Sequence, residues 1–208
     1  MESGMKSEKE ASRSIVDSFA RIIRIISIPP VMVTALIIIL SVFRFSVFGE
    51  LCQVLLAEIF LAVFPLLAYP LAYVVKPLRK KGREGERETA FVLSLIGYLI
   101  GFVYSVASGQ SEQLVFIYTI YFISVILLIA VNKIVKVRAS GHGCSVTGPC
   151  VLFCAAFGAR GLIVGAGMYV LVLWASLRTK RHTLKEFLLG SIVCGISAFI
   201  SYIAVFIL

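Results

Sequence analysis

Apolar residues run along this chain in long blocks that short polar segments separate. The candidate membrane spans cover residues 27–46, 51–75, 90–107, 113–132, 142–158, 161–177 and 186–208. Each block is close to the roughly 20 residues that a helix needs to cross a bilayer. Gly148 and Pro149 interrupt the fifth block. The pattern predicts an all-α fold, a polytopic membrane helix bundle of about six to seven transmembrane helices.

The segment before the first block has a different pattern. Its apolar residues recur at helical spacing, at Ile15, Phe19, Ile22, Ile23 and Ile26. Asp17, Arg21 and Arg24 fall largely elsewhere around the same helix. We therefore expect an amphipathic helix over residues 10–26 that lies in the membrane interface. The chain then divides into a polar tail with this helix, 1–26, and a transmembrane domain, 27–208.

Composition supports the membrane class, because 60% of the 208 residues are hydrophobic and only 15% are charged. Soluble domains of this length carry far more charge. The net charge of +9 would suggest nucleic acid in a soluble protein. Here the basic residues lie in short clusters between apolar blocks, so they are expected to set topology, with the bilayer and not nucleic acid as the partner.

The basic clusters also predict which side faces the cytoplasm. Loops 76–89, 133–141 and 178–185 fall on the same side as the N-terminal tail when the spans alternate. Of the 20 Lys and Arg residues, all except Arg44 and Arg160 then lie on that side. The positive-inside rule makes it the cytoplasmic face of a multi-pass protein of the cell membrane.

The acidic residues and cysteines limit which enzyme classes and metal sites the chain can contain. Asp17 is the only aspartate among 11 carboxylates. Membrane enzymes that hold diphosphates through magnesium need clusters of aspartate, so that class is excluded. The cysteines lie in or beside apolar blocks and are read as small core residues, with a metal site as the alternative; they are Cys52, Cys144, Cys150, Cys154 and Cys194.

Both histidines of the chain lie in the basic loops. His182 and Glu186 are four residues apart, so a carboxylate can hold one imidazole nitrogen while the other faces outward. Ser140 and Gly141 directly precede a span that begins near His142, where free N–H groups of a helix start can hold an anion. This combination predicts a nucleophile, the residue that orients it, and a phosphate clamp.

The first basic loop adds two cations. Lys80 and Arg87 are seven residues apart, which places them on one face of a helix. Single basic residues beside spans are ordinary topology signals. We assign Lys80 and Arg87 to the clamp because the other two loops carry the rest of the pattern.

These three elements together resemble the type 2 phosphatidic acid phosphatase superfamily. The resemblance covers roughly residues 76–190, through Lys80 and Arg87, then "ASGHGCSVTGP", then "RHTLKEFLLG". It implies that His182 is the phosphoryl acceptor and that His142 protonates the leaving oxygen. Glu186 would orient His182. The phosphate would be held by Lys80, Arg87, Ser140, the Gly141 amide and Arg181. No metal and no cofactor are implied.

The chain departs from the family pattern at four positions. Glu88 follows Arg87 where the family has proline, and Ala139 precedes Ser140 where proline is usual. Ser176 occupies the place of an arginine six residues before His182, and Glu186 replaces aspartate. Loss of an arginine removes a bidentate donor, which Arg178 or Arg181 would have to replace.

The sequence therefore predicts a metal-independent membrane phosphatase with a phosphohistidine intermediate. Its substrate would be a lipid-linked phosphate or diphosphate of the prenyl diphosphate, phosphatidate or phosphatidylglycerol phosphate type, and the sequence does not choose among these or fix the oligomeric state. Ser176 and Glu88 motivate an alternative, a catalytically weakened protein that binds lipid phosphates. A small transporter with basic loops is a further alternative.

Overall fold

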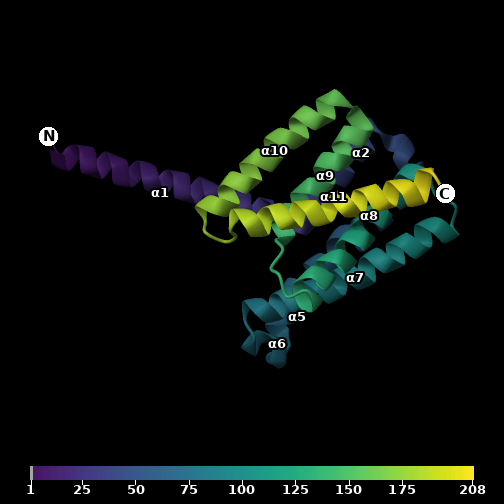
Figure 1. Ribbon diagram of the computed structural model, residues 1–208, viewed down its shortest axis with the longest axis horizontal. Coiled ribbons are helices and arrows are strands. Elements are labelled where there is room, and N and C mark those ends of the chain that lie inside the picture. The colour runs from purple at the N-terminus through teal and green to yellow at the C-terminus, as the bar shows by residue number, and fades with distance from the viewer. Residues whose placement is uncertain (1) are drawn as a thin grey trace.

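The computed structural model describes residues 2–208, and the side chains of residues 14–82 and 84–208. The regular elements in this range are all helices (Figure 1). The chain therefore has the predicted all-α class.

The first half of the chain forms a long helix, a bend, and a broken helix. Its elements are α1 (Glu2–Ile26), α2 (Pro29–Phe43), η1 (Phe45–Val47), α3 (Leu51–Glu58), η2 (Ile59–Val63), α4 (Phe64–Leu66), α5 (Ala68–Val74) and α6 (Lys76–Lys80). Pro29 and Pro30 occupy the first turn of α2, where a missing N–H costs nothing. The bend there is 70°.

The second half consists of long helices joined by short connections. Its elements are α7 (Arg83–Ala107), α8 (Glu112–Ile129), η3 (Ala130–Ile134), α9 (Gly141–Phe157), α10 (Ala159–Arg178) and α11 (Leu184–Phe206). The element η3 is a π-helical turn that continues α8. Such turns often occur at functional sites.

In the part of the chain that the structure describes, five helical segments are long and apolar enough to cross a membrane. They are Leu51–Val74, Glu84–Ala107, Glu112–Ile134, Ala159–Arg178 and Leu184–Phe206. These confirm helices at five of the predicted spans. The other two predicted spans are shorter helices, since α2 has 15 residues and α9 has 17. Counting α2 together with Ser14–Ile26 as one bent span raises the number to six, at the lower end of the predicted range.

Helix α8 lies at the centre of the bundle. It packs against α7, α9 and α11, and Leu114, Tyr118 and Ile120 are fully buried on it. Large apolar side chains on the surrounding helices point outward instead, as Ile163 and Phe199 do. Exposed apolar surface of this extent suits a lipid environment.

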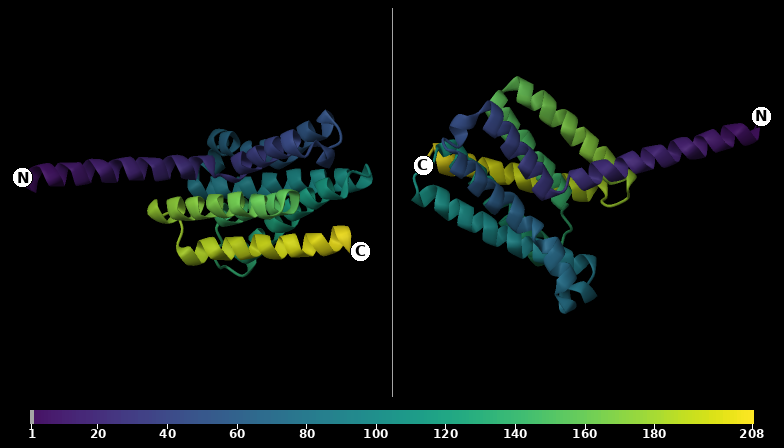
Figure 2. Two further views of the ribbon diagram at one scale, coloured as in Figure 1. Left: turned by 90° about the horizontal axis from the view of Figure 1, so that it is seen from above. Right: turned by 180° about the vertical axis from the view of Figure 1, so that it is seen from behind.

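The predicted N-terminal helix is present but longer than expected, and it projects beyond the bundle in both views of Figure 2. Ile15, Phe19 and Ile22 are exposed, whereas Ala20 and Ile23 are buried against α10 and α11. Its second half therefore shares a core with the domain that follows. Its placement in the membrane interface stays a prediction.

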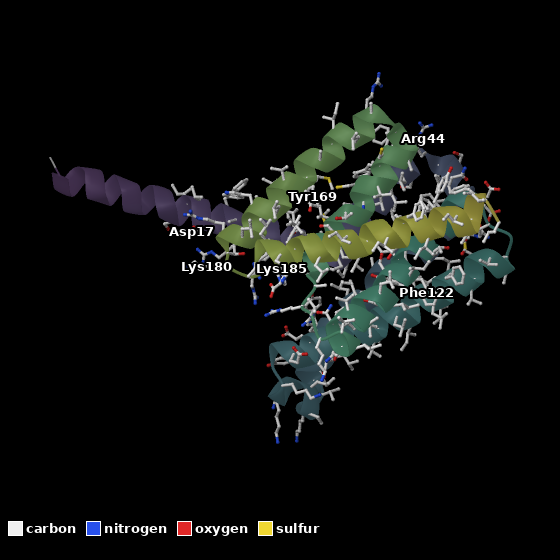
Figure 3. All side chains as sticks on the ribbon, in the orientation of Figure 1. Asp17, Arg44, Phe122, Tyr169, Lys180 and Lys185 are labelled. Atoms are coloured by element: carbon white, nitrogen blue, oxygen red, sulfur yellow. The ribbon has the colours of Figure 1, made fainter. Side chains whose placement is uncertain are left out.

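The three basic loops lie at one end of the bundle. The α5–α7, η3–α9 and α10–α11 connections gather at the end where α1 joins, and the α7–α8 turn and the C-terminus lie at the other (Figure 1). Figure 3 places Lys180 and Lys185 at the same end as Asp17, with Arg44 at the opposite end. Segments far apart in the sequence therefore meet in one place.

Candidate active site

The two histidines face each other across this end of the bundle. His142 is in the first turn of α9, and His182 lies in the loop just before α11. Their ring centroids are 5.8 Å apart. The Nε2 atom of His142 is buried and has no hydrogen-bond partner. The structure thus brings together the two residues that the sequence predicts to act on one substrate.

Two glycines allow this approach. A Cβ atom on Gly143 would lie 2.2 Å from the carbonyl oxygen of Phe187, and one on Gly190 would lie 2.1 Å from that of Ser140. No larger residue fits at either position without displacing backbone. The starts of α9 and α11 are therefore in direct contact, and the Ser140 amide donates to the Glu186 carbonyl at 2.9 Å.

Glu186 holds His182 as the sequence predicts. Its Oε2 atom lies 3.2 Å from Nδ1 of His182, and the same oxygen accepts from the Thr183 amide at 3.1 Å. Thr183 and Glu186 form a capping box at the start of α11. The other carboxylate oxygen lies 3.7 Å from Nε of Arg138. These contacts fix both the carboxylate and the imidazole.

Burial controls the charge of His182. Desolvation lowers the pKa of this imidazole below its ordinary value of 6.5, and it outweighs the Glu186 carboxylate, which raises the pKa. Arg138 and Arg87 also lower it. His182 is therefore neutral at pH 7, with the lone pair that a nucleophile needs.

Both imidazoles line a cavity of about 710 Å³. Four arginines line it as well, from four separate segments, namely Arg24, Arg87, Arg138 and Arg181. Deeper in the bundle the lining becomes mostly apolar and aromatic, with Tyr98, Ile120, Tyr121, Val125 and Leu128. Glu84 and Glu86 also line the cavity, so it combines charged groups, mostly cationic, with an apolar part.

Arg87 reaches the cavity, but Lys80 does not. The chain turns at Gly82 between α6 and α7, so the expected single helical face across Lys80 and Arg87 does not form. Lys80 is exposed on α6 and is absent from the cavity lining. Arg87 donates to Oδ1 of Asn132 in η3 and lies over the ring of Phe91. Asn132 thus positions Arg87, a contact that the sequence did not suggest.

Glu88, at the position where the family that the sequence resembles has proline, forms two ion pairs. Its carboxylate pairs with Lys81 at 2.8 Å and with Lys133 at 2.9 Å. Glu84 also contacts Lys133, at 3.4 Å. These exposed pairs tie the first turn of α7 to η3, beside Arg87.

Ser140 and Gly141 differ in their positions. Ser140 is fully buried, and its hydroxyl caps α9 by accepting from the Gly143 amide at 3.3 Å. Gly141 is the first residue of α9 and lines the cavity. The helix start therefore faces the cavity through Gly141, while Ser140 holds the helix in place.

The structure distinguishes between the two arginines that were candidates to replace the one missing at Ser176. Arg178 donates from Nε to Oδ1 of Asp17 at 2.7 Å and so turns toward α1. Arg181 lines the cavity, and its amide donates to the Ser176 carbonyl at 3.2 Å. Lys180 before it has a left-handed backbone, with φ of 51°. This tight turn directs Arg181 and His182 inward.

Sequence reasoning missed two cavity arginines. Arg138 stands two residues before Ser140, so its proximity to the motif was a usable signal. Arg24 had no such signal, because it reaches the site only through the packing of α1 on α10. Among the residues whose side chains the structure describes, no group of three or more His, Cys, Asp or Glu could hold a metal ion.

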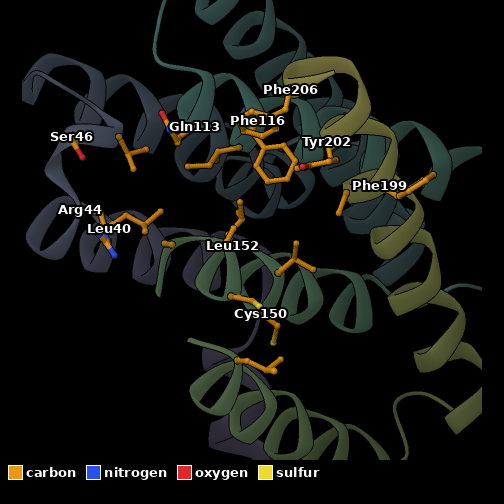
Figure 4. Close-up of a pocket in the computed structure, with 18 residues that line it drawn as sticks. Leu40, Arg44, Ser46, Gln113, Phe116, Cys150, Leu152, Phe199, Tyr202 and Phe206 are labelled. Carbon is orange, nitrogen blue, oxygen red and sulfur yellow. The ribbon is translucent and has the colours of Figure 1, made fainter. Parts of the chain in front are cut away.

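A second, larger cavity lies at the opposite end of the bundle (Figure 4). It measures about 1130 Å³ and is lined mostly by apolar residues, among them Phe116, Leu152 and Phe199. Arg44 is the one charged side chain among its described lining residues, which include no histidine or carboxylate. The smaller cavity is therefore the candidate active site.

Comparison of the chain with family models, curated proteins and solved structures finds no match. The geometry of the cavity is therefore the basis for assigning a function.

Proposed function

We propose that this protein is a metal-independent membrane phosphatase that hydrolyses lipid-linked phosphates or diphosphates through a phosphohistidine intermediate. The observation that carries the proposal is the pair of facing imidazoles, one held by a carboxylate, in a cavity lined by four arginines. A nucleophile with its orienting group beside cationic donors is the arrangement that phosphoryl transfer needs.

In the first half-reaction, Nε2 of His182 attacks phosphorus while Glu186 holds Nδ1. The bond from phosphorus to the alcohol oxygen breaks, and that oxygen takes a proton from the imidazolium form of His142. Burial lowers the pKa of this imidazole to about 4 in the free protein, so the negative phosphoryl group would have to stabilise that form. In the second half, His142 removes a proton from water as the water attacks the phosphohistidine. The N–P bond breaks, inorganic phosphate leaves, and both histidines return to their starting states.

The phosphate and the lipid part of the substrate would occupy different parts of the cavity. Arg87, Arg181 and the start of α9 at Gly141 surround the mouth and would bind the phosphoryl oxygens. The interior around Tyr98 and Tyr121 would take the part of the lipid next to the phosphate.

Release of phosphate from a panel of lipid phosphates by purified protein in EDTA tests the proposal. Turnover supports the proposal, whereas binding without turnover supports a lipid-phosphate-binding protein. If the protein neither binds nor hydrolyses these lipids, the transporter alternative is favoured.

Glu186→Gln is expected to lower kcat with little change in KM, because the carboxylate orients His182 and does not touch substrate. Glutamine keeps the capping box at this position. The low pKa of His182 places the acid limb of the kcat/KM profile below pH 6.5, since activity is lost only when the imidazole gains a proton. Removing the carboxylate lowers that pKa further, so the limb should move to lower pH.

The matched control for this variant is Glu112→Gln at the other end of the bundle, which should leave the profile unchanged. A raised KM with unchanged kcat would make Glu186 a binding or structural residue.

Arg181→Ala and Arg87→Ala are each expected to lower kcat/KM about 10- to 100-fold, the cost of losing a hydrogen bond to a charged group. Arg178→Ala should have a much smaller effect, because Arg178 pairs with Asp17 outside the cavity. Steady-state kinetics on one lipid phosphate measures all three. Equal effects from Arg178 and Arg181 would contradict this assignment of the clamp.

We also propose that the catalytic end faces the cytoplasm, because all the Lys and Arg residues except Arg44 and Arg160 belong to segments at that end. The orientation can be tested with single cysteines at Arg79 and Ser108 in a cysteine-free background. Intact cells are labelled with a membrane-impermeant maleimide, which reacts only with cysteines on the outer face. The neighbouring loop residues Gly82 and Gly109 are less suitable for cysteine, because both have positive φ, which a residue with a side chain rarely adopts. We expect labelling at 108 and not at 79, and the reverse would make the site outward-facing.

A further inference from the structure

The last turn of α1 forms part of the cavity wall. Residues of α1 are fixed against α10 by the pair of Asp17 with Arg178, 2.7 Å apart, and by the rings of Phe19 and Trp174, whose centroids are 6.2 Å apart. One residue before Arg24, Ile23 is buried. Its core cluster includes residues of α9, α10 and α11, namely Val146, Val172, Ala175 and Phe187. The register of α1 on the bundle is therefore set, and Arg24 lines the cavity.

The guanidinium of Arg24 lacks a partner of opposite charge. Its Nε atom is buried without a hydrogen-bond partner, and Arg24 forms an ion pair with none of the carboxylates whose side chains the structure describes. Of the carboxylates near the cavity, Glu84 pairs with Lys133, and Glu186 pairs with His182 and Arg138. Glu86 also lines the cavity, and it forms no ion pair with Arg24. A buried, unpaired guanidinium nitrogen is costly unless an anion binds there.

Arg24 also contacts the candidate general acid. Its backbone carbonyl faces the imidazole of His142, and its charge lies close enough to act on that ring. The unpartnered Nε2 of His142 and the unpartnered Nε of Arg24 are thus two buried groups of one cavity. A phosphoryl group bound between them would have oxygens for both.

The end of α1 also packs near Ser176. This serine is buried in α10, next to Ala175, which packs in the same cluster as Ile23. The end of α1 therefore lies against the segment of α10 where the expected arginine is absent.

We propose that α1 is part of the phosphate site and that Arg24 binds the non-bridging phosphoryl oxygens, supplying the guanidinium that position 176 lacks. This rests on the proposed phosphatase function for the identity of the anion as a phosphoryl group. Sequence position gives no hint of it, because Arg24 belongs to the segment expected to lie on the membrane as a separate anchor.

Binding of inorganic orthovanadate to the purified full-length protein tests the proposal, because vanadate resembles the phosphoryl group and its binding needs no turnover. Arg24→Ala should weaken vanadate binding and lower kcat/KM, each by about 10- to 100-fold. Arg24→Lys should recover part of both, since an ammonium keeps the charge but not the planar fork. Arg21→Ala is the matched control, because Arg21 is exposed on the same helix and bonds to the Asp17 carbonyl; it should bind vanadate as the wild type does.

Asp17→Asn separates ligand binding from docking of the helix. It removes the pair with Arg178 and leaves Arg24 in place, so it should lower vanadate affinity far less than Arg24→Ala does. Wild-type affinity in Arg24→Ala would overturn the proposal, as would equal losses of affinity and of melting temperature in Asp17→Asn and Arg24→Ala. If the wild type binds vanadate through Arg24 but releases no phosphate from any lipid, the phosphatase function fails while the anion site stands.

Discussion

Replacing His182 with alanine is expected to abolish phosphate release from lipid phosphates. The imidazole is the proposed nucleophile. Burial holds it neutral, and Glu186, which accepts a hydrogen bond from the Thr183 amide, holds it in one orientation. Loss of a nucleophile removes the covalent route, so the rate should fall by at least about 10²-fold. Release of inorganic phosphate from purified protein in EDTA measures the effect.

Lys185→Ala is a suitable control for this variant, because Lys185 is exposed and lies three residues from His182. It should retain near wild-type activity. Full activity in the His182→Ala protein would end the phosphohistidine hypothesis.

Replacing His142 with alanine should have an effect that depends on the leaving group. His142 is the proposed general acid, so its loss should slow hydrolysis of a lipid phosphate, whose alkoxide needs a proton, by about 10²-fold or more. An aryl phosphate such as p-nitrophenyl phosphate leaves without that proton and should be slowed far less. The two substrates are compared on the same preparation of the variant. Equal losses on both would assign His142 to phosphate binding or to structure.

Periodicity and spacing predicted the all-α fold and the contact of His182 with Glu186. Apolar blocks placed the helices, because backbone groups in lipid must be satisfied within a helix. The four-residue spacing of His182 and Glu186 predicted their contact, and the basic loops predicted that His142 would lie nearby. The five or six segments that could span a membrane lie at or just below the lower end of the predicted six to seven, because α2 and α9 are shorter than a full crossing, which the apolar pattern does not reveal.

The remaining features depend on tertiary packing. A turn at Gly82 changes the helical phase between Lys80 and Arg87, so a seven-residue spacing no longer means one face. Asn132 reaches Arg87 because η3 widens the end of α8. Arg24 and His142 meet because α1 packs on α10, and no local pattern connects residues so far apart in the chain.

Trapping of the covalent intermediate tests the central claim most directly. Purified protein is mixed with a lipid phosphate carrying ³²P in EDTA, quenched within one turnover, and examined for label on the polypeptide. The account predicts a label that is lost in acid, survives alkali, maps to His182 and is absent from the His182→Ala protein. Turnover in EDTA without any protein-bound label, or a label that maps to another residue, would contradict it.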